Sequence, residues 1–135
     1  MRREYLCPTC GGVLNPGNKV VFVIEHGAAR ALLLLNPRLG DYGAVAGRGI
    51  TVTPGAAYRF RCPICQADLT SPFDPNLVQV LARLGDGPPA VVAFSRIAGE
   101  HATFLQDARG LHRFGEHAAR YQELNFFGAG HGPQE

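Results

Sequence analysis

Long hydrophobic runs are missing from this sequence of 135 residues. No stretch of 18 consecutive apolar residues occurs, so we expect no membrane-spanning helix. The first ten residues, MRREYLCPTC, have no apolar segment after their arginines, so we also expect no signal peptide. We therefore expect a cytoplasmic chain whose cysteines are reduced.

Lysine is also scarce: of the 13 lysine and arginine residues, only Lys19 is a lysine. With its many alanines, glycines and prolines, this composition is typical of a protein from a GC-rich bacterial genome. Residues 1–70 carry 8 Lys and Arg against 4 Asp and Glu, whereas residues 71–135 carry 5 against 7. Four thiolates around one divalent metal would add about −2 to the first part and bring the chain close to neutral. The charge alone therefore does not require a polyanionic partner.

The motifs of common enzyme families are missing too. The sequence has no P-loop, G-x-G-x-x-G, H-E-x-x-H or G-x-S-x-G pattern. Ser71 and Ser95 are the only serines, and neither lies in a nucleophile motif. The glycine-rich stretch 40–49 has no Lys-Ser/Thr to hold a phosphate, so it is either a surface loop or a binding loop of another kind. No catalytic residue is assigned, and we expect a protein that is not an enzyme.

Most of the chain has the pattern of β-strands, and the 46% apolar content is that of a folded protein. The strongest strand is KVVFVIEH, which is rich in β-branched residues, and the last three predicted strands form an antiparallel meander. The predicted strands are 19–26, 30–36, 57–62, 90–96, 101–107 and 110–115, with a short strand at 50–53 inside an irregular stretch 37–56.

One amphipathic helix is predicted over residues 74–85. Asp74 is a good N-cap, and the next residue is a proline, which suits the first helical position. Leu77, Val80, Leu81 and Leu84 have i, i+3, i+4, i+7 spacing, which gives one apolar stripe. A second, short helix is expected within residues 116–128.

All four cysteines fall into one repeated pattern. Residues 7–14 read CPTCGGVL and residues 62–69 read CPICQADL, so both are C-P-x-C-x-x-x-L. Two residues between cysteines let both thiolates of a pair face one ion, and two such pairs form a closed tetrahedral site that suits Zn²⁺. The predicted metal ligands are Cys7, Cys10, Cys62 and Cys65.

A redox-active cysteine pair is the alternative, and it requires a cysteine at a helix N-terminus. The GGVLNPG that follows Cys10 cannot form a helix, and the QADLTSP that follows Cys65 is too short for one. The pattern therefore favours a structural metal. Iron could occupy the same four-sulfur site, so the metal is Zn²⁺ with Fe not excluded.

The two cysteine turns resemble the knuckles of a zinc ribbon, the rubredoxin-like arrangement on neighbouring hairpins. The resemblance covers roughly residues 1–27 and 56–70. It departs from short zinc modules in the 51-residue spacer 11–61, where ~15–20 residues are typical. We therefore predict an α+β fold, mainly antiparallel β, with a zinc-ribbon-like knuckle pair, a β-meander and one amphipathic helix. The expected domains are 1–73 and 74–135, packed as one compact unit.

A polar site is a further hypothesis, because GEHA occurs twice, at 99–102 and 115–118. Pairing of the last two predicted strands would gather several polar side chains for acid–base or metal chemistry. The alternative is that these side chains have no chemical role and are ordinary polar residues at hairpin ends. The candidates are Glu100, His101, His112 and His117.

Zinc ribbons often bind nucleic acid, and arginines lie near both knuckles with aromatic residues between them. The residues predicted to contact the nucleic-acid backbone are Arg2, Arg3, Arg59 and Arg61. A protein partner or a homo-oligomer is the other expectation, because Phe126 and Phe127 form an apolar pair in the polar tail. We therefore expect a non-enzymatic zinc protein with a protein-interaction or regulatory role. The alternatives are a nucleic-acid-binding zinc ribbon and a small enzyme that uses the meander His and Glu residues.

Overall fold

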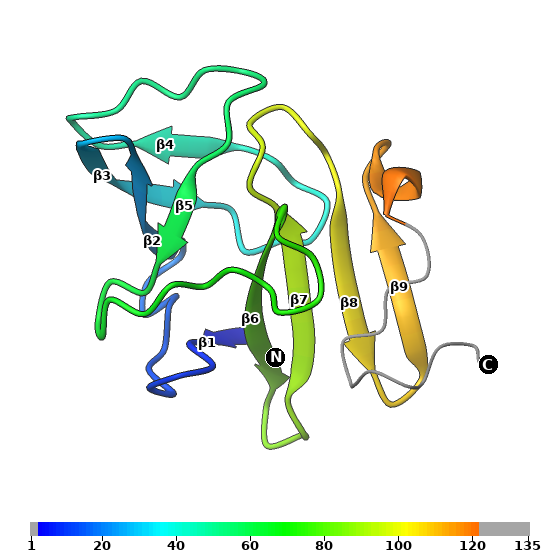
Figure 1. Ribbon diagram of the computed structural model, residues 1–135. Helices are drawn as coiled ribbons and strands as arrows, with labels where there is room; N and C mark the ends of the chain where they lie inside the picture. The colour runs from blue at the N-terminus through cyan, green and yellow to red at the C-terminus, as the bar shows by residue number, and fades with distance from the viewer. Residues whose placement is uncertain (1–2, 122–135) are drawn as a thin grey trace.

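The computed structural model describes residues 3–121, and these form two antiparallel β-sheets (Figure 1). The five-stranded sheet has the order β1-β6-β7-β8-β9, and the four-stranded sheet has the order β4-β3-β2-β5. The strands of the five-stranded sheet are β1 Arg3–Leu6, β6 Leu77–Leu84, β7 Ala90–Ser95, β8 Thr103–Asp107 and β9 Gly110–Phe114. Those of the four-stranded sheet are β2 Val20–His26, β3 Ala29–Leu35, β4 Ala44–Ala46 and β5 Arg59–Arg61.

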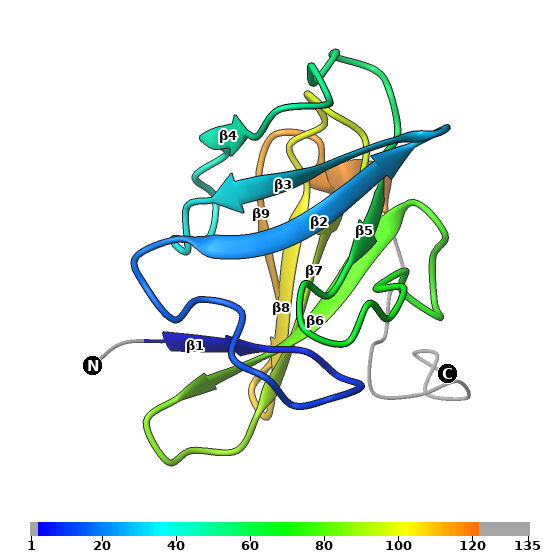
Figure 2. The same cartoon turned by 90° about the vertical axis from the view of Figure 1, so that its left-hand side faces the viewer.

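The main hydrophobic core lies between the two sheets. Figure 2 shows β2 and β3 running across the strands of the five-stranded sheet. Phe22, Phe60 and Phe94 pack against one another, with ring centroids 5.3 to 5.6 Å apart. They come from β2, β5 and β7, so this aromatic cluster joins both sheets.

A second, smaller core covers the outer face of the five-stranded sheet. Phe104 of β8 is fully buried there and meets Tyr121 edge to face at 5.7 Å. Tyr121 follows a single 3₁₀ turn, Ala118–Arg120, which falls within the stretch where a short helix was expected. The five-stranded sheet is thus apolar on both faces.

Six predicted strands are confirmed. The sequence range 19–26 corresponds to β2, 30–36 to β3 and 57–62 to β5. The three predicted meander strands correspond to β7, β8 and β9, which pair in sequence order.

The predicted amphipathic helix is wrong, and with it the α+β class, because the regular secondary structure of the described residues is nearly all antiparallel β and includes no helix of seven or more residues. Residues 77–84 form the strand β6, which pairs with β1 and β7. Residues 77–84 also fit the two-residue period of a strand, with a partly different set of apolar residues. Val78, Val80 and Ala82 face the main core at alternate positions, whereas Leu77 belongs to the outer core. A strand that is buried on both faces therefore resembles an amphipathic helix in sequence.

The helix-start signals have another role. The side-chain Oδ1 of Asp74 accepts a hydrogen bond from the Asn76 N–H at 2.8 Å, and its carbonyl accepts one from the Leu77 N–H at 3.1 Å. These contacts close a turn that leads into β6.

Two strands were misplaced or missed. The short strand predicted at 50–53 is wrong, because those residues are irregular and β4 forms earlier, at 44–46. The four-residue β1 was not predicted. It pairs with β6, so the N-terminal segment belongs to the same sheet as the C-terminal half of the chain.

Candidate metal centre

Each cysteine pair lies in a turn at the end of a strand. Cys7 follows β1, and its carbonyl accepts a hydrogen bond from the Gly11 N–H at 2.9 Å. Cys62 follows β5, and its carbonyl accepts one from the Gln66 N–H at the same distance. The two turns, which we call knuckle 1 (residues 7–12) and knuckle 2 (residues 62–67), therefore have the same backbone bonding.

The repeat extends beyond the cysteines. The residue two positions before each pair is aromatic and buried: Tyr5 is 4% exposed and Phe60 is 5% exposed. The leucine four positions after each pair is also buried: Leu14 is fully buried and Leu69 is 2% exposed. The Leu14 N–H bonds to the Tyr5 carbonyl at 2.7 Å, and the Leu69 N–H bonds to the Phe60 carbonyl at 2.9 Å. Each knuckle is thus held by a short hairpin that is anchored in the main core.

The two knuckles bring their four sulfur atoms together. The Cys7 and Cys65 Sγ atoms are 3.8 Å apart, and the Cys10 and Cys62 Sγ atoms are 3.9 Å apart. All four Sγ atoms lie within 4.8 Å of one another. A tetrahedral ion with Zn–S bonds of about 2.3 Å requires sulfur atoms about 3.8 Å apart. The cluster therefore has the donor type, number and spacing of a closed four-sulfur metal site.

Backbone N–H groups point at the buried sulfur of each knuckle. The N–H groups of Thr9 and Cys10 lie 3.3 and 3.4 Å from Cys7 Sγ. Those of Ile64 and Cys65 lie at the same distances from Cys62 Sγ. Such bonds stabilise thiolate charge, which a divalent metal also requires of its ligands.

The pKa values of the two buried cysteines, Cys7 and Cys62, are shifted in opposite directions. Burial opposes ionisation of Cys7, but the N–H bonds from Cys10 and Thr9 outweigh it and lower the pKa of Cys7 to about 7. Burial raises the pKa of Cys62 to about 12. Metal binding at neutral pH would therefore displace protons from this cluster.

The cluster lies where the chain crosses between the sheets. Knuckle 1 leads from β1 of the five-stranded sheet towards β2, since the Val21 N–H bonds to the Leu14 carbonyl at 2.8 Å. Knuckle 2 leads from β5 of the four-stranded sheet towards β6, since the Gln79 N–H bonds to the Leu69 carbonyl at 2.8 Å. An ion bound to both knuckles would tie the two sheets together at this end.

The knuckles differ at one backbone position. Gly11 has φ +75° and Gln66, its counterpart, has φ +68°. Glycine adopts this left-handed conformation without strain, but a residue with a Cβ does not. The Gln66 side chain accepts a hydrogen bond from Arg30, which helps to hold the strained turn.

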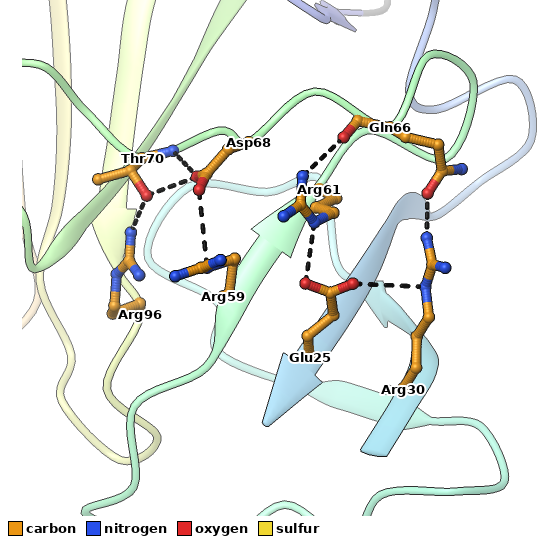
Figure 3. Close-up of polar contacts among 8 residues, drawn as sticks. All are labelled: Glu25, Arg30, Arg59, Arg61, Gln66, Asp68, Thr70 and Arg96. Atoms are coloured by element: carbon orange, nitrogen blue, oxygen red, sulfur yellow. Dashed lines mark hydrogen bonds and ion pairs between the residues drawn. The ribbon is translucent and has the colours of Figure 1, made fainter. Parts of the chain in front are cut away.

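Charged side chains beside knuckle 2 form a paired cluster (Figure 3). Arg61 donates from Nε to Glu25 at 2.8 Å and from Nη1 to the Gln66 carbonyl at 3.0 Å. The hydrogen bond from Arg61 outweighs the opposite effect of burial on Glu25, so the pKa of this carboxyl is lowered. Arg59 Nε lies 3.6 Å from Asp68.

These contacts bear on the four arginines expected to meet nucleic acid. Arg59 and Arg61 are engaged with acidic side chains. The aromatic residues beside them in sequence, Tyr58 and Phe60, are buried in the core. Arg3 lies in β1, where its carbonyl accepts a hydrogen bond from Asn15 at 2.9 Å. Arg2 is outside the described residues, as are Phe126 and Phe127.

The meander polar residues form three separate groups. The His101 backbone N–H donates to His117 Nδ1 at 2.9 Å, and the His101 ring lies 3.1 Å from Glu116. His112 lies instead beside Asp107 at 3.3 Å. Glu100 has its own set of partners, so the structure brings together His101 and His117 but not all four candidates.

Glu100 is the centre of a network that the sequence did not indicate. Its side chain is 9% exposed and accepts hydrogen bonds from Ser95 at 2.6 Å, from Arg120 at 3.0 Å and from the Tyr121 hydroxyl. Burial would raise the pKa of Glu100, but these bonds together lower it. Burial and the same contact raise the pKa of Tyr121 to about 12. The partners lie 5 to 21 residues away in sequence, and no local motif links them.

No family model matches the chain, and comparisons with curated proteins and with solved structures give no significant match. Among residues 3–121, no helix is long and apolar enough to cross a membrane. The four-cysteine cluster, which is compatible with metal binding, is thus the feature on which a function can be argued.

Proposed function

We propose that this protein is a non-enzymatic zinc protein whose Cys₄ centre is structural. The observation that carries the proposal is the spacing of 3.8 and 3.9 Å between sulfur atoms of different knuckles, which matches tetrahedral zinc–thiolate geometry. The ligands are Cys7, Cys10, Cys62 and Cys65. Bound zinc would hold knuckle 1 against knuckle 2 and so fix the two sheets at their crossing point.

The donor set argues against a catalytic metal. A catalytic zinc usually has three protein ligands and keeps one position for water or substrate. Here four thiolates fill a tetrahedron, and the cluster found among the described residues contains no histidine or carboxylate. The expected role of the ion is therefore to stabilise the fold.

Metal identity is tested directly on the purified protein. The proposal predicts one zinc per chain by elemental analysis, released by a strong chelator together with a loss of thermal stability. Iron in the same site would colour the protein, because ferric thiolate centres absorb visible light. One iron per chain would preserve the structural role but overturn the assignment of zinc.

A protein-interaction role is the biological function that we propose for the fold that the zinc stabilises. Leu32 and Val45 are 51% and 61% exposed, and they lie on neighbouring strands of the four-stranded sheet. Leu34, opposite Val45 in the register, extends this apolar surface. Exposed apolar surface of this kind is typical of a site for another protein or for a second copy of the chain.

The oligomeric state tests this role. Sedimentation of the zinc-loaded protein should show a concentration-dependent dimer, or a pull-down should capture a protein partner. Leu32→Glu should abolish whichever interaction is found. Leu84→Glu is the control, because Leu84 is equally exposed at 51% but lies on the other sheet. A monomer that captures no protein, or equal effects of both variants, would contradict the role. Salt-sensitive binding of RNA that is lost in Arg59→Ala would favour the nucleic-acid alternative instead.

A further inference from the structure

A cavity of about 210 Å³ lies between the two sheets. Most of its wall is apolar, and it is built from the side chains that would otherwise meet in the middle of the main core. The residues that enclose it from the two sheets include Phe22, Ile24, Leu33, Phe60, Val80, Val92 and Phe94. Core side chains normally fill such a space, so a cavity of this size is an exception to close packing.

Two tyrosines of the wall, Tyr5 and Tyr58, have their hydroxyl groups paired with backbone groups. The Tyr5 hydroxyl donates to the Pro37 carbonyl, and the Tyr58 hydroxyl accepts a hydrogen bond from the Thr53 N–H at 2.8 Å. The wall also contains Arg96, whose buried Nε has no hydrogen-bond partner among the described residues, but the larger, apolar part of the wall offers none of the two to four polar partners that a buried water needs. The wall atoms thus lack contacts that an apolar ligand would supply.

The aromatic cluster in the wall indicates the kind of ligand. Phe22, Phe60 and Phe94 all line the cavity, and they already meet one another edge to face or tilted. A further ring can join such a cluster in the same geometry. An engineered apolar cavity of about 150 Å³ in another protein binds benzene, so this one has room for a single ring with a small substituent.

One side of the cavity adjoins the molecular surface. Its lining shares six residues with a shallow surface hollow, so the two spaces adjoin there. The shared residues are Arg38, Leu39, Gly40, Asp41, Tyr42 and His101. The Tyr42 and His101 rings stack on this side, with centroids 4.3 Å apart and planes 9° apart.

We propose that this cavity is a binding site for a small molecule with one aromatic ring, which enters past the stacked Tyr42 and His101. The site goes beyond the proposed structural zinc and is separate from the exposed face of the four-stranded sheet. It uses the interior that the two sheets enclose.

The test uses the full zinc-loaded chain and toluene as the probe, followed by the methyl signals of the protein in ¹³C NMR. Toluene should cause saturable shifts of the Val80 and Val92 methyl groups, with a dissociation constant of about 1 mM or lower. Methyl groups on the outer face, such as those of Val91, should shift much less. An absence of saturable shifts, or larger shifts on the outer face, would overturn the proposal.

A pair of adjacent substitutions gives the matched control. Val92 lines the cavity, whereas Val91 points to the other face of the same strand. Val92→Phe should weaken toluene binding at least tenfold by filling the cavity, and Val91→Phe should leave it within about twofold. Equal effects of the two variants would contradict the site, as would tighter binding of methylcyclohexane than of toluene. Should Val92→Phe not fold, the shifts in the wild-type protein decide the matter.

Discussion

Loss of the metal should destabilise the fold by an amount that follows from the loop it closes. A crosslink between Cys7 and Cys65 spans 58 residues. The chain-entropy relation for crosslinks gives about 4 kcal/mol for a loop of this length. Domains of this size have stabilities of about 5–15 kcal/mol, so the metal would supply a large part of the total.

We therefore expect Cys62→Ser, or treatment of the wild type with a strong chelator, to lower the free energy of unfolding by about 4 kcal/mol. For a chain of this size the corresponding fall in melting temperature is roughly 10–20 °C. Differential scanning calorimetry under reducing conditions measures it. The chelator should have no further effect on Cys62→Ser, because that variant has already lost the site.

Thr9→Ala is the matched control for this experiment. Thr9 is an exposed residue between the two cysteines of knuckle 1, and its substitution leaves all four sulfur ligands in place. The variant should melt close to the wild type and respond equally to the chelator. Equal melting temperatures for the metal-loaded and chelated wild type would refute the structural role of the metal.

Three further predictions concern single side chains. Gln66→Gly should be more stable than Gln66→Ala by about 1 kcal/mol in urea unfolding, because only glycine relieves the backbone strain at φ +68°. Both variants lose the contact with Arg30, so that loss cancels in the comparison. A more stable Gln66→Ala would contradict the strain. Glu100→Gln should cost about 1.5–3 kcal/mol at neutral pH. The pKa of Glu100 is lowered in the fold, so its charge stabilises the protein above the ordinary value of 4.5, and this stabilisation is lost as the pH falls through the lowered pKa. The difference in unfolding free energy between wild type and Glu100→Gln should therefore shrink as the pH falls below 4.5, and a difference that stays constant in acid would show that the charge is not involved. Leu84→Ala should change the unfolding free energy by less than about 0.5 kcal/mol, because Leu84 is 51% exposed at the end of β6. Val80→Ala should cost at least about 1 kcal/mol, because Val80 is buried in the main core. Similar losses for the two variants would contradict the strand and favour a helix with one apolar stripe.

The four-cysteine cluster could be predicted from the sequence because its signal is local. Two residues between cysteines specify a turn, and the repetition of the pattern 55 positions later specifies a partner for it. The strands β2 and β3 were also predictable, because β-branched and apolar runs end at turn residues. In each case the pattern that identifies the element is local, although the contact between the two knuckles joins residues 52 and 58 positions apart.

The helix error has a different origin. Leu77, Val80, Leu81 and Leu84 fit a helical period, and Asp74 fits a helix start. A central strand covered on both faces shows no clear alternation of polar and apolar residues, so periodicity alone does not separate the two structures. The pairing of β6 with β1, 71 or more residues earlier, decided the outcome, and a single sequence does not contain that information locally.

The cavity and the Glu100 network could not be predicted for a related reason. Phe22, Phe60 and Phe94 are separated by more than 30 residues, and their meeting depends on how the two sheets cross. Glu100 was noted for its place in a repeated GEHA stretch, but its partners come from the end of β7 and from the 3₁₀ turn. Such sites arise from packing and not from a motif.

The coordination of the proposed metal is the most direct test of the central claim. X-ray absorption at the zinc edge of the purified protein should show four sulfur neighbours at about 2.3 Å and no lighter ligand. A protein that contains no metal, or a zinc ion with nitrogen or oxygen in its first shell, would contradict the proposed Cys₄ centre.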